Sequence, residues 1–200
     1  CSYAGDLHIE QGQKESLRIE GDDNIIPLVR TKVTTGRLEV TYRLPSVSCD
    51  LQPTKAVKIY LTVRDVRSIS LSGAWSLSCG GVRSENLELD LSGACKARLR
   101  VNAKQIRVTL SGASKCTLAG ETQSQKVNVT GASAYCALEL ASEKCSIYLS
   151  GASRGEVNAS QTIGGSVTGV STLRYKGKPS VKMSVEEWGS KGSRVERIGD

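Results

Sequence analysis

Hydrophobic and polar residues alternate along this chain in a pattern that recurs six times, each time just before a glycine. The residues two positions before these glycines are all apolar: Leu71, Leu91, Leu110, Val129, Leu149 and Val167. Four positions before them stand Ile69, Leu89, Val108, Val127, Ile147 and Gly165. Because side chains on a β-strand point alternately to its two faces, the pattern predicts six strands whose apolar residues face a common interior.

The glycines define a repeat of about twenty residues. They are Gly73, Gly93, Gly112, Gly131, Gly151 and Gly169, so the steps are 20, 19, 19, 20 and 18 residues. This period is too short for helical hairpins and predicts an all-β, parallel β-helix-like solenoid with about 19–20 residues per coil. Ser or Thr precedes each glycine and Ala follows five of them, which predicts tight, stacked corners whose hydroxyls bond local backbone groups.

A second apolar alternation follows each glycine, beginning four residues after it. In the fourth copy it is displaced by one residue, to Cys136, Leu138 and Leu140, which predicts a β-bulge. The displacement also predicts that Cys116 and Cys136 are inward neighbours on adjacent coils. Because parallel side chains on in-register strands fit disulfide geometry poorly, we expect these thiols to pack as small hydrophobic groups.

Outside the repeat the pattern is less regular. We expect a single β-solenoid domain over residues 1–200, with less regular N-terminal coils in 1–66, regular coils in 67–179 and a C-terminal cap or tail in 180–200. The tail is charged and contains Trp188, and a cap would protect the exposed strand edges of the last coil.

Composition agrees with a narrow aliphatic interior, and its positive charge would suit an acidic partner but is also common in soluble basic proteins without one. Aromatic residues are 4% of the chain and Phe is absent, whereas a compact sandwich usually has large rings in its core. No apolar run is long enough to span a membrane. The net charge of +7 suits an anionic polysaccharide, a membrane surface or nucleic acid, and the few aromatics available for base stacking disfavour nucleic acid.

The seven cysteines do not form a disulfide framework. Their number is odd, their spacing is not fixed, and there is no CxxC pair of the kind that serves zinc or redox chemistry. Cys1 is compatible with the lipid-bearing first residue of a lipoprotein, although we favour a position inside a first strand.

The residues that could support catalysis or metal binding are dispersed. No two carboxylates recur at the same position on adjacent coils, and the GGxGxD motif of calcium-binding β-rolls is absent. His8 is the sole histidine, and we expect it to be an exposed strand residue. In SGACK and SGASK each Lys follows the Ser by four residues rather than the three of the SxxK motif. We therefore predict a protein with no catalytic residues, no metal and no cofactor.

Basic residues recur at outward positions of the second strand. The predicted ligand-binding stripe consists of Lys96, Arg98, Lys115, Arg154 and Arg174. Stacked coils would place these charges along one face, where a polyanion could bind them. The alternative is that they provide solubility and prevent edge association.

Several phrases together resemble the putative auto-transporter adhesin, head GIN domain family of bacterial proteins. They are LHIEQG, LRIEGDDNIIP followed by TTGRLEV, the series of SGAS corners, and STLRYKGKP. The resemblance covers about residues 4 to 180. It implies a right-handed parallel β-helix-like fold on exported or cell-surface bacterial proteins, often lipoproteins, and it assigns no functional residues.

These inferences together favour a non-enzymatic interaction or adhesion module of the bacterial cell envelope, periplasmic, outer-surface or secreted, with a lipid anchor left open. The favoured ligand is an anionic polysaccharide, and another envelope protein is the alternative partner. Two other functions are kept: a structural spacer or self-assembling unit, and a polysaccharide-processing enzyme.

Overall fold

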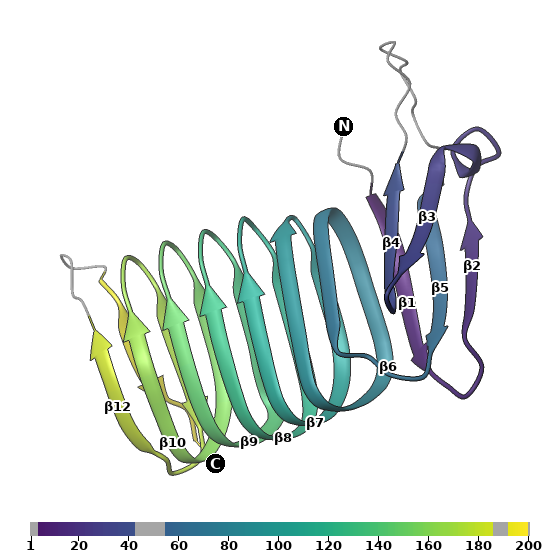
Figure 1. Cartoon of the computed structure of the whole chain (residues 1–200). Helices are drawn as coiled ribbons and strands as arrows, with labels where there is room; N and C mark the ends of the chain where they lie inside the picture. The colour runs from purple at the N-terminus through teal and green to yellow at the C-terminus, as the bar shows by residue number, and fades with distance from the viewer. Residues whose placement is uncertain (1–3, 43–54, 186–191, 200) are drawn as a thin grey trace.

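The main body of the protein is a parallel β-solenoid of about six turns, which confirms the predicted fold class (Figure 1). The structure is a computed structural model that describes residues 4–42, 55–185 and 192–199. No helix in these ranges is long and apolar enough to cross a membrane.

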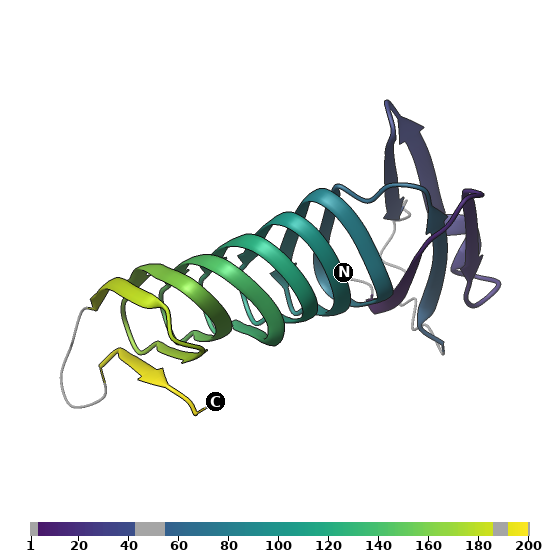
Figure 2. The ribbon, with the colours of Figure 1, turned by 90° about the horizontal axis from the view of Figure 1, so that it is seen from below.

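Most strands form one large sheet that winds around the solenoid. In chain order the elements are β1 (Ala4–Gln11), β2 (Ser16–Glu20), η1 (Ile26–Leu28), β3 (Val29–Thr34), β4 (Arg37–Tyr42), β5 (Val57–Val63), β6 (Ser68–Gly93), β7 (Lys96–Leu110), β8 (Lys115–Val129), β9 (Ala134–Leu149), β10 (Arg154–Val167), β11 (Thr172–Lys176), β12 (Ser180–Val185) and β13 (Arg194–Arg197). The spatial order is β13-β11-β10-β9-β8-β7-β6-β1-β5-β2, and β12 pairs with β10. The long strands β6–β10 bend, so each contributes to both walls of its coil (Figure 2).

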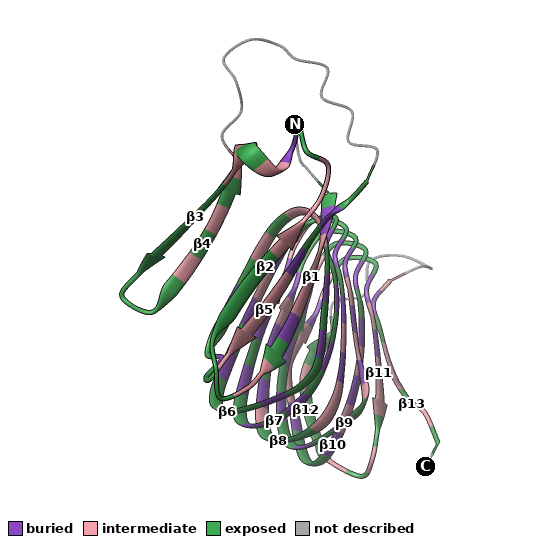
Figure 3. Ribbon diagram, turned by 90° about the vertical axis from the view of Figure 1, so that its right-hand side faces the viewer, coloured by how far each residue is buried: buried purple, intermediate pink, exposed green. Residues whose placement is uncertain are grey.

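The coils stack in register, so that equivalent residues lie above one another. Between β7 and β8, for example, Val108 pairs with Val127. Both side chains are fully buried, and inward buried residues alternate with outward, more exposed ones along most of β7 and β8 (Figure 3). The predicted inward rows are therefore confirmed.

The glycine corners are as tight as the repeat predicts. Gly112 has a φ of +76°, and a Cβ at this position would lie 2.5 Å from the carbonyl oxygen of Gly93 in the coil below. That carbonyl accepts a 2.8 Å hydrogen bond from the amide of Ala113. Only glycine combines this backbone conformation with so close an approach between corners. The hydroxyl before the glycine bonds the preceding coil, not local backbone as expected: Thr130 Oγ1 donates to the Leu110 carbonyl at 3.2 Å.

A ladder of small polar side chains, which the repeat pattern did not predict, lines the interior beneath the corners. Its members occupy equivalent buried positions: Cys95, Ser114, Ser133, Ser153, Ser171 and Ser193. Ser133 is typical, because its hydroxyl donates to the Gly112 carbonyl at 3.2 Å and accepts from the Ser114 amide at 3.2 Å. This hydroxyl thus gives the Ser114 amide an acceptor and adds a second hydrogen bond to the Gly112 carbonyl, which also accepts from the Ala132 amide at 2.8 Å.

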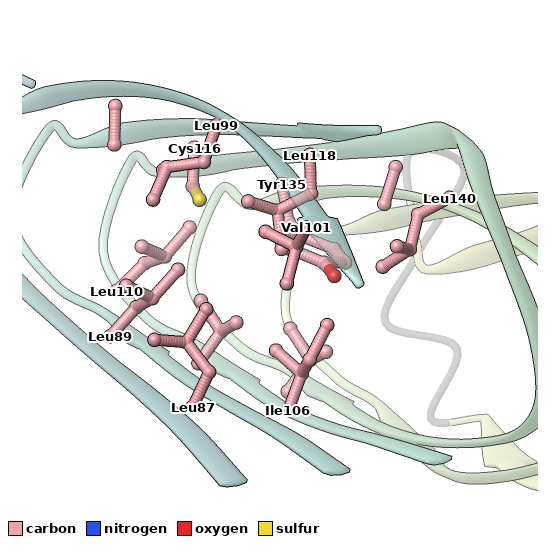
Figure 4. Packing of buried hydrophobic residues seen from close by; sticks show 14 of the residues in the cluster. Leu87, Leu89, Leu99, Val101, Ile106, Leu110, Cys116, Leu118, Tyr135 and Leu140 are labelled. Atoms are coloured by element: carbon pink, nitrogen blue, oxygen red, sulfur yellow. The ribbon is translucent and has the colours of Figure 1, made fainter. Parts of the chain in front are cut away.

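The fourth coil contains the predicted bulge, but the side chains that precede the bulge have the opposite orientation from the one predicted. The register between β8 and β9 shifts after Thr117, as a bulge requires. However, Tyr135 and Ala137 are the fully buried residues of this strand segment, and Cys136 lies on the outer side, half-buried (Figure 4). The prediction that Cys136 lies inward beside Cys116 is therefore wrong.

Hydrogen bonds explain why a tyrosine occupies the core here. The Tyr135 hydroxyl donates to Gln125 Oε1 at 2.8 Å, and Gln125 Nε2 donates to Ser142 Oγ at 2.9 Å. Ser142 in turn donates to the Asn158 carbonyl at 2.6 Å. A buried polar group is tolerated when it is paired in this way.

The N-terminal end differs from a coil. β1 inserts between β5 and β6 and pairs in parallel with both. β2 is antiparallel to β5, and β3 and β4 form a separate hairpin, which stands beside the solenoid (Figure 2). Thr35 and Gly36 at its turn have φ values of 49° and 74°, as tight hairpin turns require. A small core of Ile25, Val57 and Ile59 lies under this region.

The C-terminal segment continues the solenoid. β12 stacks in register on β10, and β13 stacks on β11. Together they add the two walls of a further coil. Trp188, which was expected in a cap, lies outside the described residues.

Candidate functional site

Outward side chains on the wall that follows each corner form rows across the coils. In one row Lys96 of β7 is the direct partner of Lys115 of β8. In the next row Arg98 pairs with Thr117. Paired strands are about 4.8 Å apart and alternate residues of a strand about 7 Å apart, so the three cations form one compact group. All three are exposed.

Arg100 belongs to the same group, although the sequence analysis did not include it. It follows Arg98 by two residues on β7, is exposed, and pairs with Ala119. Extending the period-two alternation by one step would have found it. Within the described ranges no carboxylate lies at ion-pair distance from Lys96, Arg98, Arg100 or Lys115, which we call the basic cluster.

The other two residues of the predicted stripe lie apart from the basic cluster. Arg154 is in the same row as Lys115, but Ala134 of β9 separates them. Arg174 is flanked by acids, with Glu156 as its partner on β10 and Glu196 Oε2 3.5 Å from its Nε. The structure therefore brings three of the five predicted residues together and places two elsewhere.

A polar row continues from the basic cluster toward the N-terminal strands. Arg98 pairs with Ser78 of β6, whose Oγ lies 2.7 Å from His8 Nδ1. The His8 ring stacks on Tyr60, with centroids 4.9 Å apart and planes inclined by 14°. The Arg18 guanidinium lies over the same Tyr60 ring, 5.5 Å from its centroid. His8 is thus half-buried in a row of planar side chains rather than a plainly exposed strand residue.

The surroundings of His8 do not resemble a catalytic triad. In the described part of the chain, none of the hydrogen bonds joins His8 to a carboxylate. Among the same residues, no group of three or more His, Cys, Asp or Glu side chains is placed to hold a metal ion.

The cysteines in the described ranges are thiols with a structural role. The described free cysteines are Cys79, Cys95, Cys116, Cys136 and Cys145, and all except Cys136 are buried. Burial raises the pKa of the Cys145 thiol to about 12 and raises that of Cys116 further. These thiols stay protonated at neutral pH and fill the interior as small apolar groups. Cys1 and Cys49 lie outside the described residues.

A shallow hollow lies beside the end of β1, and its polar groups bond one another. Its lining is Gln11, Gly12, Gln13 and Arg64. Gln11 Nε2 donates to the Arg64 carbonyl at 2.7 Å, and Arg64 Nε donates to the Gln13 carbonyl at 3.0 Å. These hydrogen bonds hold the end of β1 against the neighbouring chain segments.

Comparison with known families gives one match over most of the chain. The model of the family described as "Putative auto-transporter adhesin, head GIN domain" matches residues 2–179. Among curated proteins none matches.

Three solved structures show the same fold at low sequence identity. A putative adhesin from Bacteroides fragilis is 21% identical with a TM-score of 0.86, over 98% of this chain and 89% of the other. A putative adhesin from Parabacteroides distasonis is 18% identical with a TM-score of 0.75, over 99% and 90%. A protein from the same species named a putative lipid binding protein is 18% identical with a TM-score of 0.71, over 98% and 90%.

Proposed function

This chain belongs to the putative auto-transporter adhesin, head GIN domain family, and we propose that it is a non-enzymatic interaction module of the bacterial cell envelope that binds an anionic polysaccharide through the basic cluster. The adhesin names of the family and of its structural neighbours support a binding role and an envelope location.

The observation that carries the proposal is the uncompensated charge on β7 and β8. Lys96 and Lys115 are direct cross-coil partners, an arrangement that destabilises a sheet when no counter-charge is present. Arg98 and Arg100 add two more cations beside them. Elsewhere on the same wall Arg174 has Glu196 for a partner. A bound polyanion would supply the negative charge that the basic cluster lacks.

The chemistry of the surface favours an acidic glycan over other polyanions. The coils present the four charges on a flat sheet at strand spacing, with Ser76 and Ser78 hydroxyls on the next strand as hydrogen-bond partners for sugar oxygens. Around the cluster there are no aromatic side chains on β7 or β8 on which nucleic acid bases would stack.

Binding to sulfated and uronic-acid polysaccharides, with a neutral glucan beside them, tests the proposal at low and high salt. The test variant carries Lys96→Ser, Arg98→Ser, Arg100→Ser and Lys115→Ser. The matched control removes four exposed cations from the other wall: Arg107→Ser, Lys126→Ser, Lys144→Ser and Lys182→Ser. Both lower the formal net charge of +7 by four, so a general charge effect would weaken them equally.

We expect salt-sensitive binding of the acidic glycans by the wild type and the control, and a loss on the order of 100-fold in the test variant, since each exposed ion pair contributes about 0.2–1 kcal/mol. An equal loss of affinity in both variants would mean that binding depends on the net charge of the protein and not on the basic cluster. No binding of any glycan by the wild type would remove the proposed ligand and favour a structural or protein-binding role.

A further inference from the structure

Inward-facing residues of the last coil are exposed to solvent, whereas the equivalent residues of the coil below are buried. Val181 and Val185 of β12 are 39% and 40% exposed, although their partners Ile163 and Val167 of β10 are fully buried. Met183, between the two valines, is half-buried and packs against the main core. The solenoid core thus ends in an apolar surface that a further layer would cover.

The backbone at this end also has groups available for pairing. Among the described strands, β12 pairs with β10 alone and β13 with β11 alone. The Arg194 amide donates down to the Ser171 carbonyl at 2.9 Å, and Thr168 on the other wall likewise donates down to Leu149 at 2.9 Å. Since amides alternate in direction along a strand, those of Val195 and Met183 point to the open side.

Met183 and Val195 lie opposite each other across the core. Met183 stacks above Gly165 and Ile147, and Val195 stacks above Leu173 and Gly155. A Cβ at Gly155 would lie 2.9 Å from Ile147 Cδ1, so the two columns face one another. A single two-fold axis perpendicular to the walls can therefore pass between Met183 and its copy on one wall and between Val195 and its copy on the other.

Such an axis would pair each strand with its own copy in a complementary register. On β12, antiparallel pairing about Met183 puts Val181 opposite Val185 of the second copy and Lys182 opposite Ser184. On β13, pairing about Val195 puts Arg194 opposite Glu196 in both directions. Apolar residues then meet apolar residues inside, opposite charges meet outside, and no like charges are opposed.

We propose that this C-terminal edge is an interface with a second copy of the chain, joined end to end about a two-fold axis by antiparallel pairing of β12 with β12 and of β13 with β13. The contact is isologous, so it closes as a dimer and leaves neither C-terminal edge free to propagate a fibre. Both basic clusters of the dimer stay exposed. The proposal does not depend on any ligand.

Sedimentation velocity of the full chain over a wide concentration range tests the interface. We expect a monomer–dimer equilibrium, and we expect Val195→Lys to weaken it by about tenfold or more, because two like charges would meet on the axis. Val170→Lys is the matched control, since Val170 is 61% exposed at a corner and away from the edge. Circular dichroism confirms that both variants are folded.

A charge exchange tests the register itself. Arg194→Glu alone should weaken the dimer, and adding Glu196→Arg should restore it, because the opposed pair is then re-formed with its signs reversed. A chain that is monomeric at every concentration would overturn the proposal, as would a dimer insensitive to Val195→Lys. Open-ended species of increasing size would overturn the two-fold geometry. A double variant no stronger than Arg194→Glu alone would overturn the register.

Discussion

The same wall of the solenoid carries two groups of charged residues that differ in their balance. On β7 and β8, Lys96 and Lys115 are stacked directly and have no acidic partner among the described residues. On β10, β11 and β13, the column of Glu156, Arg174 and Glu196 alternates in sign. The two groups lie in adjacent outward rows of one regular wall, so the fold does not set this difference.

In a regular solenoid the backbone is the same from coil to coil, so the residue at each outward position determines where charges are paired and where they are not. Between the two groups lies β9, whose outward residues Ala134 and Cys136 carry no charge. Because Tyr135 points inward there, Cys136 must point outward. The bulged coil therefore separates an unpaired basic surface from a self-compensated one.

The largest expected effect on stability is at the corner that precedes Lys115. Gly112→Ala would place a methyl group 2.5 Å from the Gly93 carbonyl oxygen at a φ of +76°. We expect the free energy of unfolding to fall by about 3 kcal/mol. Gly81→Ala is the matched control, with no atom within 4 Å of the added Cβ, and should change it by about 0.5 kcal/mol or less. Urea unfolding of both variants measures the contrast, and equal effects would refute the close-packed corner.

Alkaline pH should weaken the interior that both charged groups share. The pKa of Cys145 is raised from 9.0 to about 12, and that of Cys116 is raised as well, so both thiols ionise more readily in the unfolded chain. Their contribution to stability is complete below pH 9 and is lost as pH rises toward the folded-state pKa values. Each thiol removes about 1.4 kcal/mol per pH unit above 9. Cys145→Ala should therefore flatten the pH dependence of urea unfolding, and an unchanged slope would contradict the buried-thiol account.

The separation by β9 depends on the buried hydroxyl of Tyr135. Tyr135→Phe removes the donor to Gln125 Oε1 and should cost about 1–3 kcal/mol of unfolding free energy, because a buried acceptor loses its partner. Tyr148 is 44% exposed, so Tyr148→Phe should have an effect of about 0.5 kcal/mol or less. Thermal unfolding distinguishes the two, and a neutral Tyr135→Phe would show that the network does not hold the bulge.

The smallest expected changes in unfolding free energy come from removing single surface cations. Arg174→Ser breaks an exposed ion pair and should lower the unfolding free energy by about 0.5 kcal/mol. Arg98→Ser removes a cation that has like charges beside it and should be neutral or slightly stabilising. A precise urea titration at low salt checks the sign of each change. A clear loss of stability in Arg98→Ser would mean that the basic cluster has a structural counter-charge.

Local and repeated features were the predictable part of this molecule. Leu110 and Gly112 recur in register, so the inward row and the corner follow from strand period and glycine conformation. Arg100 was equally accessible, one step further along the same alternation. The hairpin turn at Thr35 and Gly36 also had a local signal in TTGR.

Features that depend on distant partners were not predictable in the same way. The sequence pattern predicts Tyr135 as an outward residue, because its hydrogen-bond partner Gln125 inside the preceding coil is visible only in the structure. The pairing of Arg174 depends on Glu196 in a tail that seemed to leave the repeat. The insertion of β1 between β5 and β6 is likewise set by packing across the chain, not by its own sequence.

According to the proposed function, stacked cations without an acidic partner bind acidic glycans. Building such a group on β9, β10 and β11, where the charges are now paired or absent, is the most direct test. The starting protein is the four-site variant that lacks the cluster, and to it are added Ala134→Lys, Thr172→Lys and Glu156→Ser beside Arg154. These changes stack four cations in one row, at positions 134, 154, 172 and 194, and remove the acid Glu156 next to them. If uncompensated, in-register cations are sufficient for binding, salt-sensitive binding of acidic glycans returns. A folded variant that stays unable to bind would contradict the account.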